Sequence, residues 1–280
     1  MNFKTILVHL DHSQRSGVRA AIAARWSRAH ESHLIGLLPT GLYDGVIPAD
    51  AIPTGMTDYI AESADYLRQR AEAIARAFRQ GITGSGPLLY EVRLVDGATA
   101  DAVVRFGRAS DLLVLGQSDA DEGLDTTVRG LPEPVLMEVG RPVLVVPSAG
   151  AFEAMPENIV VAWDGSREAA VALQAALPAL RRAARVTLVS LRHPGDADAA
   201  RQLLVPDMVQ YLMRHGVQAH AESLVTEIDL AEALLSRLSD LGADLLVMGG
   251  YGHSRLRERV LGGVTRQILA QMTVPVLMAH

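Results

Sequence analysis

The chain has 280 residues, of which 49% are hydrophobic and 21% charged, with a formal net charge of −6 and no cysteine. This length suggests about two domains with sizeable cores. The negative charge argues against a general nucleic-acid binder, and the lack of cysteine excludes disulfides, thiolate metal sites and cysteine nucleophiles.

The N-terminal stretch MNFKTILVHLDHS is apolar but is interrupted by His9 and Asp11. It is too short and too polar for a signal peptide. No apolar run approaches the roughly 18 residues that span a bilayer. We therefore expect a cytoplasmic protein that has neither a membrane nor a nucleic acid as its partner.

The first half of the chain begins as an alternating α/β sequence. An apolar strand starts at Lys4, and it is followed by Asp11-x-Ser13 and an alanine-rich amphipathic helix. The Pro/Gly-rich segment Gly41–Tyr59 reads as a loop that leads into a helix capped by Thr57. Further apolar strands are expected within Ala109–Gln117 and Arg141–Pro147.

The second half repeats this pattern. Its first strand starts near Glu157, and Asp164-x-Ser166 and another alanine-rich helix follow. ADLLVMGG within Gly242–Gly250 matches SDLLVLGQ of the first half, and VPVLMAH at Val274–His280 matches RPVLVVP. Such self-similarity indicates two copies of one structural unit.

In the second half the hydrophobic pattern predicts five strands and four helices. The strands are expected near Ile159–Trp163, Val186–Leu191, Gln218–Leu224, Leu245–Met248 and Val276–Ala279. The helices are expected near Arg167–Arg182, Asp207–His215, Leu230–Leu241 and Val264–Gln271. Pro206 suits the first turn of its helix.

Alternating strands and helices predict α/β domains with parallel sheets and helices on both faces. We expect two tandem open five-stranded sheets with strand order 3-2-1-4-5, which is a Rossmann-like arrangement similar to the adenine nucleotide alpha hydrolase fold. The linker Ser148–Pro156 separates a first domain, residues 1–150, from a second, residues 151–280.

Glycines cluster after the fourth strand of the second half, in the spacing Gly249-x-x-Gly252, nine residues, Gly262. Gly262 and Gly263 stand just before a helix, where unpaired N–H groups and the helix dipole attract anions. With strand order 3-2-1-4-5, this segment meets Asp164 at the point where the strand order reverses, which is where open α/β sheets bind ligands. The pattern predicts a phosphate cradle.

The glycine spacing, the aspartate after the first strand and PVLM as the final strand together resemble the nucleotide-binding signature of the universal stress protein family, in a tandem two-domain form. The resemblance implies ATP as the ligand, with or without Mg²⁺, and it covers essentially the whole chain. The positions that it implicates in nucleotide binding are Ala162, Trp163, Asp164, Leu191, Gly249, Tyr251, Gly252, Gly262, Gly263, Val264 and Thr265.

Two positions depart from the family pattern. Gly263 stands where the family has Ser or Thr, so a hydroxyl donor to phosphate is missing, although the backbone N–H remains. Trp163 is bulky for a position beside the base, and it either stacks on adenine or fills the pocket.

The first half lacks the cradle. Gly116 matches Gly249, but Asp119 and Arg129 stand where the second half has Gly252 and Gly262. The acidic run that begins at Asp119 would repel phosphate. We expect this domain to be degenerate and structural, and to form an intramolecular pseudo-dimer with the second half.

The strands Val143–Val146 and Val276–Ala279 are the expected contact of this pseudo-dimer, because an unpaired apolar edge needs covering. The sequence leaves open whether two chains also form a homodimer. His9/His12, His30/His33 and His215/His220 are close pairs without acidic partners at ligand spacing, so no metal site and no metal-binding residues are expected.

These patterns predict a stress-response protein whose C-terminal half binds ATP and which acts as a nucleotide-dependent signalling or regulatory protein. No catalytic residue is assigned, and at most slow ATP hydrolysis is expected. One alternative is a nucleotide-independent scaffold that acts through protein contacts. A more remote alternative is a serine hydrolase with Ser118 as nucleophile, but Ala120 stands where the nucleophile elbow needs glycine.

Overall fold

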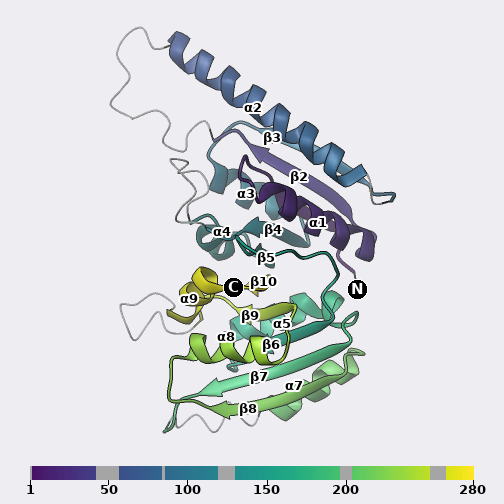
Figure 1. The fold of residues 1–280 in the computed structure, drawn as a ribbon, viewed down its shortest axis with the longest axis vertical. Coiled ribbons are helices and arrows are strands. Elements are labelled where there is room, and N and C mark those ends of the chain that lie inside the picture. Colours follow the sequence, from purple (N-terminus) through teal and green to yellow (C-terminus); the bar gives the residue numbers. More distant parts are fainter. Residues whose placement is uncertain (1, 42–56, 84–85, 119–129, 196–203, 253–262) are drawn as a thin grey trace. The chain divides into compact units, whose positions relative to one another are not determined.

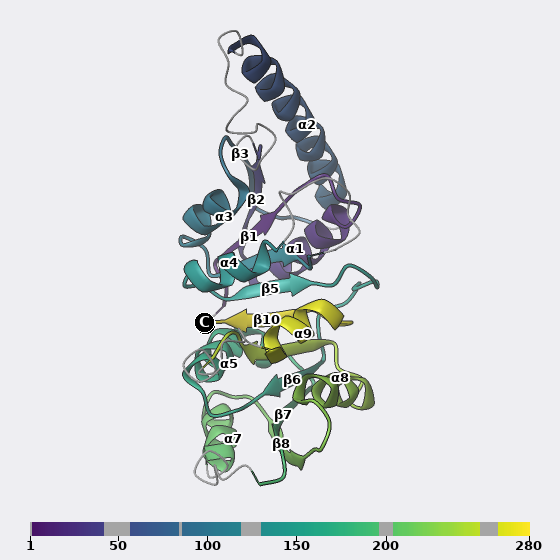
Figure 2. The same cartoon turned by 90° about the vertical axis from the view of Figure 1, so that its left-hand side faces the viewer.

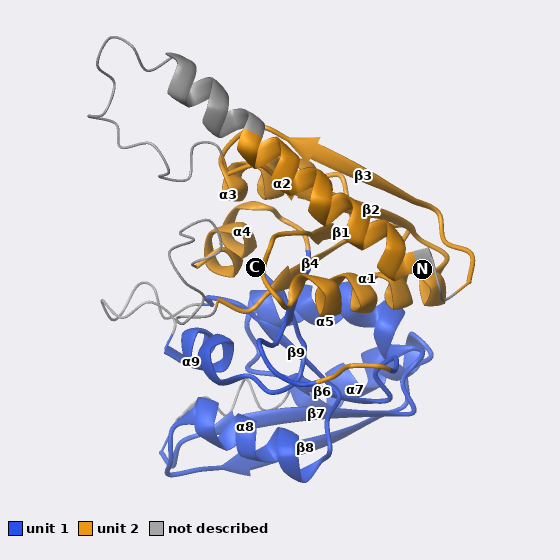
Figure 3. Ribbon diagram, turned by 45° about the horizontal axis from the view of Figure 1, so that its top comes forward, with its two compact units in different colours: residues 1, 142–150, 154–280 blue, residues 2–141, 151–153 orange. Residues whose placement is uncertain are grey.

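The structure is a computed structural model that describes residues 2–41, 57–83, 86–118, 130–195, 204–252 and 263–280. These residues form two compact units (Figure 3). The N-terminal unit comprises residues 2–141 and 151–153, and the C-terminal unit comprises residues 142–150 and 154–280. Among the described residues, no helix combines the length and apolarity needed to cross a bilayer.

The N-terminal unit alternates strands and helices along the chain (Figure 1). Its elements are β1 (Thr5–His9), α1 (Ser16–His30), β2 (His33–Pro39), α2 (Thr57–Thr83), β3 (Tyr90–Val95), α3 (Thr99–Gly107), β4 (Leu112–Gly116) and α4 (Pro132–Glu138). Parallel pairing gives the order β3-β2-β1-β4.

The C-terminal unit follows the same plan. Its elements are β5 (Val143–Val146), β6 (Asn158–Ala162), α5 (Arg167–Leu180), β7 (Arg185–Arg192), α7 (Leu204–Arg214), β8 (Ala219–Val225), α8 (Leu230–Asp240), β9 (Leu245–Gly249), α9 (Gly263–Gln271) and β10 (Val276–Ala279). Parallel pairing gives the order β8-β7-β6-β9-β10, and β5 adds to β10 antiparallel.

Helices cover both faces of the C-terminal sheet, with α5 and α7 on one side and α8 and α9 on the other (Figure 2). The central strands are therefore apolar along their whole length, as in LLVM of β9, where all four side chains are buried. The outer strand β8 lacks a neighbour among the described residues on its far side, and most of its side chains are exposed or half-buried.

The fold class expected from the sequence is confirmed: the chain forms α/β units with mostly parallel sheets and helices on both faces. In the second half the predicted elements agree with the observed ones to within three residues, and the largest difference is α7, which begins at Leu204 rather than Asp207. The helix predicted after the Pro/Gly-rich segment is present and begins at Thr57, whereas capping by Thr57 stays a prediction.

The predicted pairing of Val143–Val146 with Val276–Ala279 is present. Val276 lies opposite Val145 and Met278 lies opposite Val143 in an antiparallel ladder. Both strands are fully buried, so the pairing covers an apolar edge that would otherwise be exposed. The domain division after residue 150 stays a prediction.

Candidate functional site

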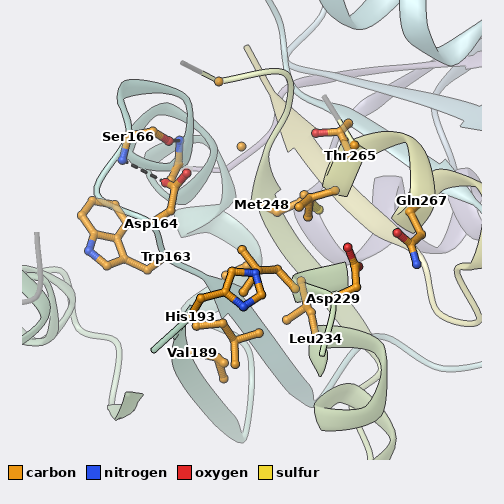
Figure 4. A pocket seen from close by; sticks show the side chains of 18 residues that line it. Trp163, Asp164, Ser166, Val189, His193, Asp229, Leu234, Met248, Thr265 and Gln267 are labelled. Atoms are coloured by element: carbon orange, nitrogen blue, oxygen red, sulfur yellow. Dashed lines mark hydrogen bonds between the residues drawn. The ribbon is translucent and has the colours of Figure 1, made fainter. Parts of the chain in front are cut away.

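A cavity of about 550 Å³ opens at the carboxyl ends of the C-terminal strands (Figure 4). β6 pairs with β7 on one side and with β9 on the other, so the strand order reverses beside β6. The volume falls within the range of small-molecule sites, which is roughly 300–1,000 Å³. The lining residues are Ala162, Trp163, Asp164, Ser166, Ala169, Val189, Leu191, His193, Asp229, Leu230, Leu234, Met248, Gly249, Gly252, Gly263, Val264, Thr265 and Gln267.

The turn from β6 into α5 is held by two short hydrogen bonds. Asp164 Oδ1 accepts from the N–H of Ser166 at 2.9 Å, and Ser166 Oγ accepts from the N–H of Ala169 at 3.1 Å. The second bond caps α5. Asp164 itself is exposed at the rim, so its other carboxylate oxygen can meet a ligand.

Trp163 follows β6 and is 5% exposed. Its backbone N–H donates to the carbonyl of Val189 at 2.8 Å, which continues the pairing of β6 with β7. The indole Nε1 is buried and has no hydrogen-bond partner among the described residues. Trp163 is thus part of the cavity wall.

Gly249 allows a close approach of two backbones. A Cβ at this position would lie 2.5 Å from the backbone nitrogen of Ala169 and 2.7 Å from the carbonyl carbon of Glu168. The first turn of α5 therefore packs directly against the end of β9. Gly252 has more room, because its nearest neighbour would be Glu168 Oε2 at 3.3 Å. A Cβ on Gly263 would meet nothing within 4 Å.

Tyr251 connects the end of β9 to α9. Its φ of 53° is left-handed, which is uncommon for a residue with a side chain. Its N–H donates to Thr265 Oγ1 at 3.2 Å, and both residues are buried. Tyr251 does not line the cavity, whereas Thr265 does.

The structure thus gathers nine of the predicted positions around one cavity: Ala162, Trp163, Asp164, Leu191, Gly249, Gly252, Gly263, Val264 and Thr265. Gly262 lies outside the described residues.

Several wall residues were missed in the sequence. Val189 and Leu191 lie on one face of β7, and His193 follows two residues after Leu191, just beyond the strand, yet only Leu191 was predicted. Because side chains alternate between the faces of a strand, the spacing of two residues from Leu191 was the sequence signal for Val189 and His193. Asp229 caps α8 by accepting from the N–H groups of Ala231 and Glu232 at 2.8 and 3.2 Å.

An aspartate directly before an apolar helix predicts a cap, so this role of Asp229 could be inferred from the sequence. Its position on the cavity wall could not. His193 Nδ1 lies 3.1 Å from the carbonyl oxygen of Thr226, which ties the ends of β7 and β8 together. Leu234, Met248 and Gln267 join the wall from three different elements.

In the N-terminal unit the equivalent space is occupied by an arginine. Arg19 Nη2 lies 2.7 Å from Asp11 Oδ2, and Arg19 Nε donates to the carbonyl of His9 at 2.9 Å. The guanidinium lies so close to Gly116 that a Cβ there would collide with it. The described residues form a small cavity of about 60 Å³ beside His9 and Asp11.

Burial perturbs the two titratable groups beside Arg19. It disfavours the imidazolium and lowers the pKa of His9 to about 4, although Asp11 acts in the opposite direction. Burial also opposes ionisation of Asp11, but Arg19 and the hydrogen bond from Ser13 outweigh it and lower the pKa of Asp11 to about 2. Arg19 is the main cause of the low pKa of Asp11, because His9 is neutral near pH 7 and adds no positive charge there.

Replacing Gly249 by Ala should destabilise the protein by about 1–3 kcal/mol, because the new Cβ meets rigid backbone. The matched change Gly263→Ala should leave the free energy of unfolding within about 1 kcal/mol of the parent, because the space there is open. Denaturant unfolding of both variants measures the difference. Equal losses would show that the contact between β9 and α5 does not restrict position 249.

The stability of the protein should decrease as the pH falls from 6.5 to about 4, because the unfolded chain protonates His9 before the folded chain does. A second loss should follow between pH 3.8 and about 2, where Asp11 protonates. Thermal melting across this range tests both. His9→Gln should reduce the first loss, and His220→Gln, at an exposed position, should not. The same pH profile for all three proteins would contradict this assignment.

Comparison with known proteins finds a family match in the C-terminal half. Residues 155–280 match the sequence model of the universal stress protein family. A curated protein of Synechocystis sp., universal stress protein Slr1230, is 28% identical over 177 residues. That match covers 62% of this chain and 56% of the relative, so the chain corresponds to little more than half of the relative's length.

Solved structures share the fold over nearly the whole chain. A universal stress protein from Archaeoglobus fulgidus DSM 4304 superposes with a TM-score of 0.76 at 18% identity, covering 98% of this chain and 95% of that one. A functionally unknown protein from Pseudomonas aeruginosa PAO1 gives a TM-score of 0.59 at 14% identity, covering 99% and 92%. The structures thus show the same fold, and the match to the universal stress protein family that the sequence led us to expect extends over residues 155–280.

Proposed function

We propose that the C-terminal half binds ATP, or a related adenine nucleotide, in the 550 Å³ cavity. The protein then acts in a stress response as a nucleotide-dependent signalling or regulatory protein. The observation that carries this proposal is the position of the cavity, which lies where the strand order reverses and is lined by the glycine segment.

The wall offers a suitable surface for each part of a nucleotide. Ala162, Trp163 and Leu191 form an apolar end that suits the base. Asp164 presents a carboxylate to the ribose hydroxyls, and hydrogen bonds to a charged acceptor are worth about 1.5–3 kcal/mol. A phosphate chain would lie against Gly252 and the first turn of α9, where the helix N-terminus attracts anions.

Only the second half is proposed to bind nucleotide. In the first half Arg19 neutralises Asp11 and occupies the space beside Gly116. The cavity that the described residues form beside His9 and Asp11 has about 60 Å³, which is far below the roughly 300 Å³ of the smallest ordinary ligand sites. Asp119, where the second half has Gly252, lies outside the described residues. The first half then serves as the structural partner in an intramolecular pseudo-dimer.

An efficient enzyme is not part of this proposal. Ser118, the remote candidate for a nucleophile, is exposed, and its Oγ accepts a hydrogen bond from the N–H of Gly130 at 3.0 Å. Among the described residues no imidazole contacts it, so the base that would activate a serine is missing there. The competing function is a nucleotide-independent scaffold, which the absent hydroxyl at Gly263 favours.

The binding proposal predicts that the purified protein releases adenine nucleotide on denaturation, or that the nucleotide-free protein binds Mg-ATP by calorimetry. Gly252→Val should abolish binding, because the side chain blocks the approach of phosphate to the backbone. Asp119→Ala should leave binding unchanged, because it changes the half without the cavity. If the protein has no nucleotide and shows no heat of binding at millimolar ATP, the scaffold function replaces this proposal.

Gly263→Ser should increase the affinity for ATP by about tenfold, because it adds a hydroxyl donor at the start of α9 where space is open. Gly263→Ala controls for the effect of a side chain on helix formation and should give little or no increase. Calorimetric titration of the three proteins separates the two effects. A gain of similar size for Ala and Ser would refute a role for the hydroxyl.

A further inference from the structure

The outer strand of the N-terminal sheet, β3, has one open edge. Among the described residues it pairs with β2 alone, in parallel. The carbonyls of Leu89 and Val95 each accept a hydrogen bond at 2.9 Å from the side of β2. Backbone groups alternate between the two sides of a strand, so the N–H and C=O groups of Tyr90, Val92 and Leu94 point away from β2. These three residues present backbone donors and acceptors to an incoming strand.

A groove lies between this edge and α2. Its volume is about 420 Å³, and its lining residues are Ala71, Glu72, Ala75, Arg76, Arg79, Val92 and Leu94. Side chains also alternate along a strand, so Tyr90 shares the face of Val92 and Leu94, and its ring packs edge-on against Phe78 of α2 with centroids 6.1 Å apart. The residues whose backbone faces the open edge thus also carry the side chains on the groove side of the strand.

The edge is apolar where soluble proteins usually protect it. Leu94 is 42% exposed, and Leu89, directly before the strand, is 76% exposed. Native edge strands are commonly blunted by charges, by proline or by a covering element, because unpaired backbone groups recruit other strands. On the groove side β3 carries none of the first two. An extended segment that pairs with β3 and places alternate side chains in the groove fits this surface, as in other cases of strand addition.

The groove face of the edge is basic. Arg76 and Arg79 line the groove, and both are exposed. Glu72 lies 4.0 Å from Arg76, but both side chains are exposed, so this pair contributes little. Arg79 makes no ion pair among the described residues. This surface therefore attracts an anionic group, although the chain as a whole has a net charge of −6.

The opposite face of the edge also carries arginines. Arg93 of β3 and Arg105 of α3 lie over the ring of Phe106, at 5.8 and 5.6 Å from its centroid. Arg93 also pairs with Glu91 of its own strand, whereas Arg105 makes no ion pair among the described residues. A strand added to β3 would thus have a basic side chain available on each face of the sheet.

We propose that the open edge of β3 binds an extended segment of a partner protein in which acidic residues alternate with apolar ones. The apolar side chains enter the groove, and the acidic ones lie on the other face beside Arg93 and Arg105. Arg76 and Arg79 attract the carboxylates that flank the apolar positions. The N-terminal unit then has a binding role of its own, which does not depend on nucleotide binding by the second half.

A second copy of this chain fits the edge less well. Two β3 strands paired about a twofold axis perpendicular to the sheet would place Arg76 and Arg79 of both copies on the same face. Like charges close together repel, whereas acidic side chains at these positions would be attracted. The charge of the edge therefore favours an acidic partner over self-association.

The test uses the full chain and a fluorescent eight-residue peptide in which Glu alternates with Val, followed by fluorescence anisotropy. The same peptide with Lys in place of Glu should bind at least about tenfold more weakly. Amide hydrogen exchange should slow in Tyr90–Val95 when the acidic peptide is bound, and not in Ala219–Val225, the outer strand of the second half. If the acidic peptide does not bind, or if it protects β8 instead of β3, the proposal is wrong.

Two variants separate the backbone and charge contributions. Val92→Pro removes an outward N–H without removing a hydrogen bond to β2, and it should weaken binding by about tenfold or more. The double variant Arg76→Glu, Arg79→Glu leaves the backbone intact and should weaken binding to a similar extent. Arg214→Glu is the matched control, because it changes an exposed arginine of α7, the helix before β8, and it should bind as the parent does.

Thermal melting shows whether each variant is folded, and the double arginine variant decides the outcome if Val92→Pro does not fold. Binding of the acidic peptide by the double variant with the affinity of the parent would overturn the proposal. Sedimentation of the parent covers the remaining occupant. A dimer that Val92→Pro dissociates would assign the edge to a second copy of the chain instead of an acidic partner.

Discussion

The contact between the first turn of α5 and the end of β9 organises the candidate site. It depends on Gly249, because any side chain there would collide with the backbone at Ala169. Through this contact the turn that carries Asp164 and Ser166 comes to lie beside Gly252. A helix that stood farther away would separate the carboxylate from the glycine segment, and the two would no longer border one cavity. The glycine therefore has a structural role that is independent of any ligand.

The two halves of the chain use the same βα turn in different ways. Asp11 and Asp164 each accept a hydrogen bond from the serine two residues later, at 3.0 and 2.9 Å. In the first half Arg19 then pairs with Asp11, whereas the corresponding residue in the second half is the buried Ala172. The arginine side chain thus fills space beside Gly116 that an alanine side chain is too short to reach. A buried ion pair stabilises little overall, but removing one partner leaves an uncompensated charge.

Some buried polar groups in and beside the candidate site have hydrogen-bond partners, and others have none. Ser166 and Asp229 are engaged as helix caps, and Thr265 accepts from the N–H of Tyr251. These residues make the wall rigid. The indole nitrogen of Trp163 and Oε2 of Glu168, in contrast, are buried without partners among the described residues. Unsatisfied buried groups are rare in native proteins, so these two atoms differ from the other polar groups in and beside the site.

Strand periodicity, the internal repeat and the glycine spacing were sufficient to predict the fold class, the strand order, and Asp164 and the glycines of the cavity wall, because these depend on local patterns and on how parallel strands end. The other predicted wall residues, Ala162, Trp163, Leu191, Val264 and Thr265, came from the resemblance to the universal stress protein family. The sequence patterns could not reveal Glu168 and Asp229 on or beside the wall, or Arg19 beside Gly116. These positions depend on how closely a helix packs against a strand distant in sequence. That distance is decided by side-chain packing in three dimensions, which no local pattern encodes.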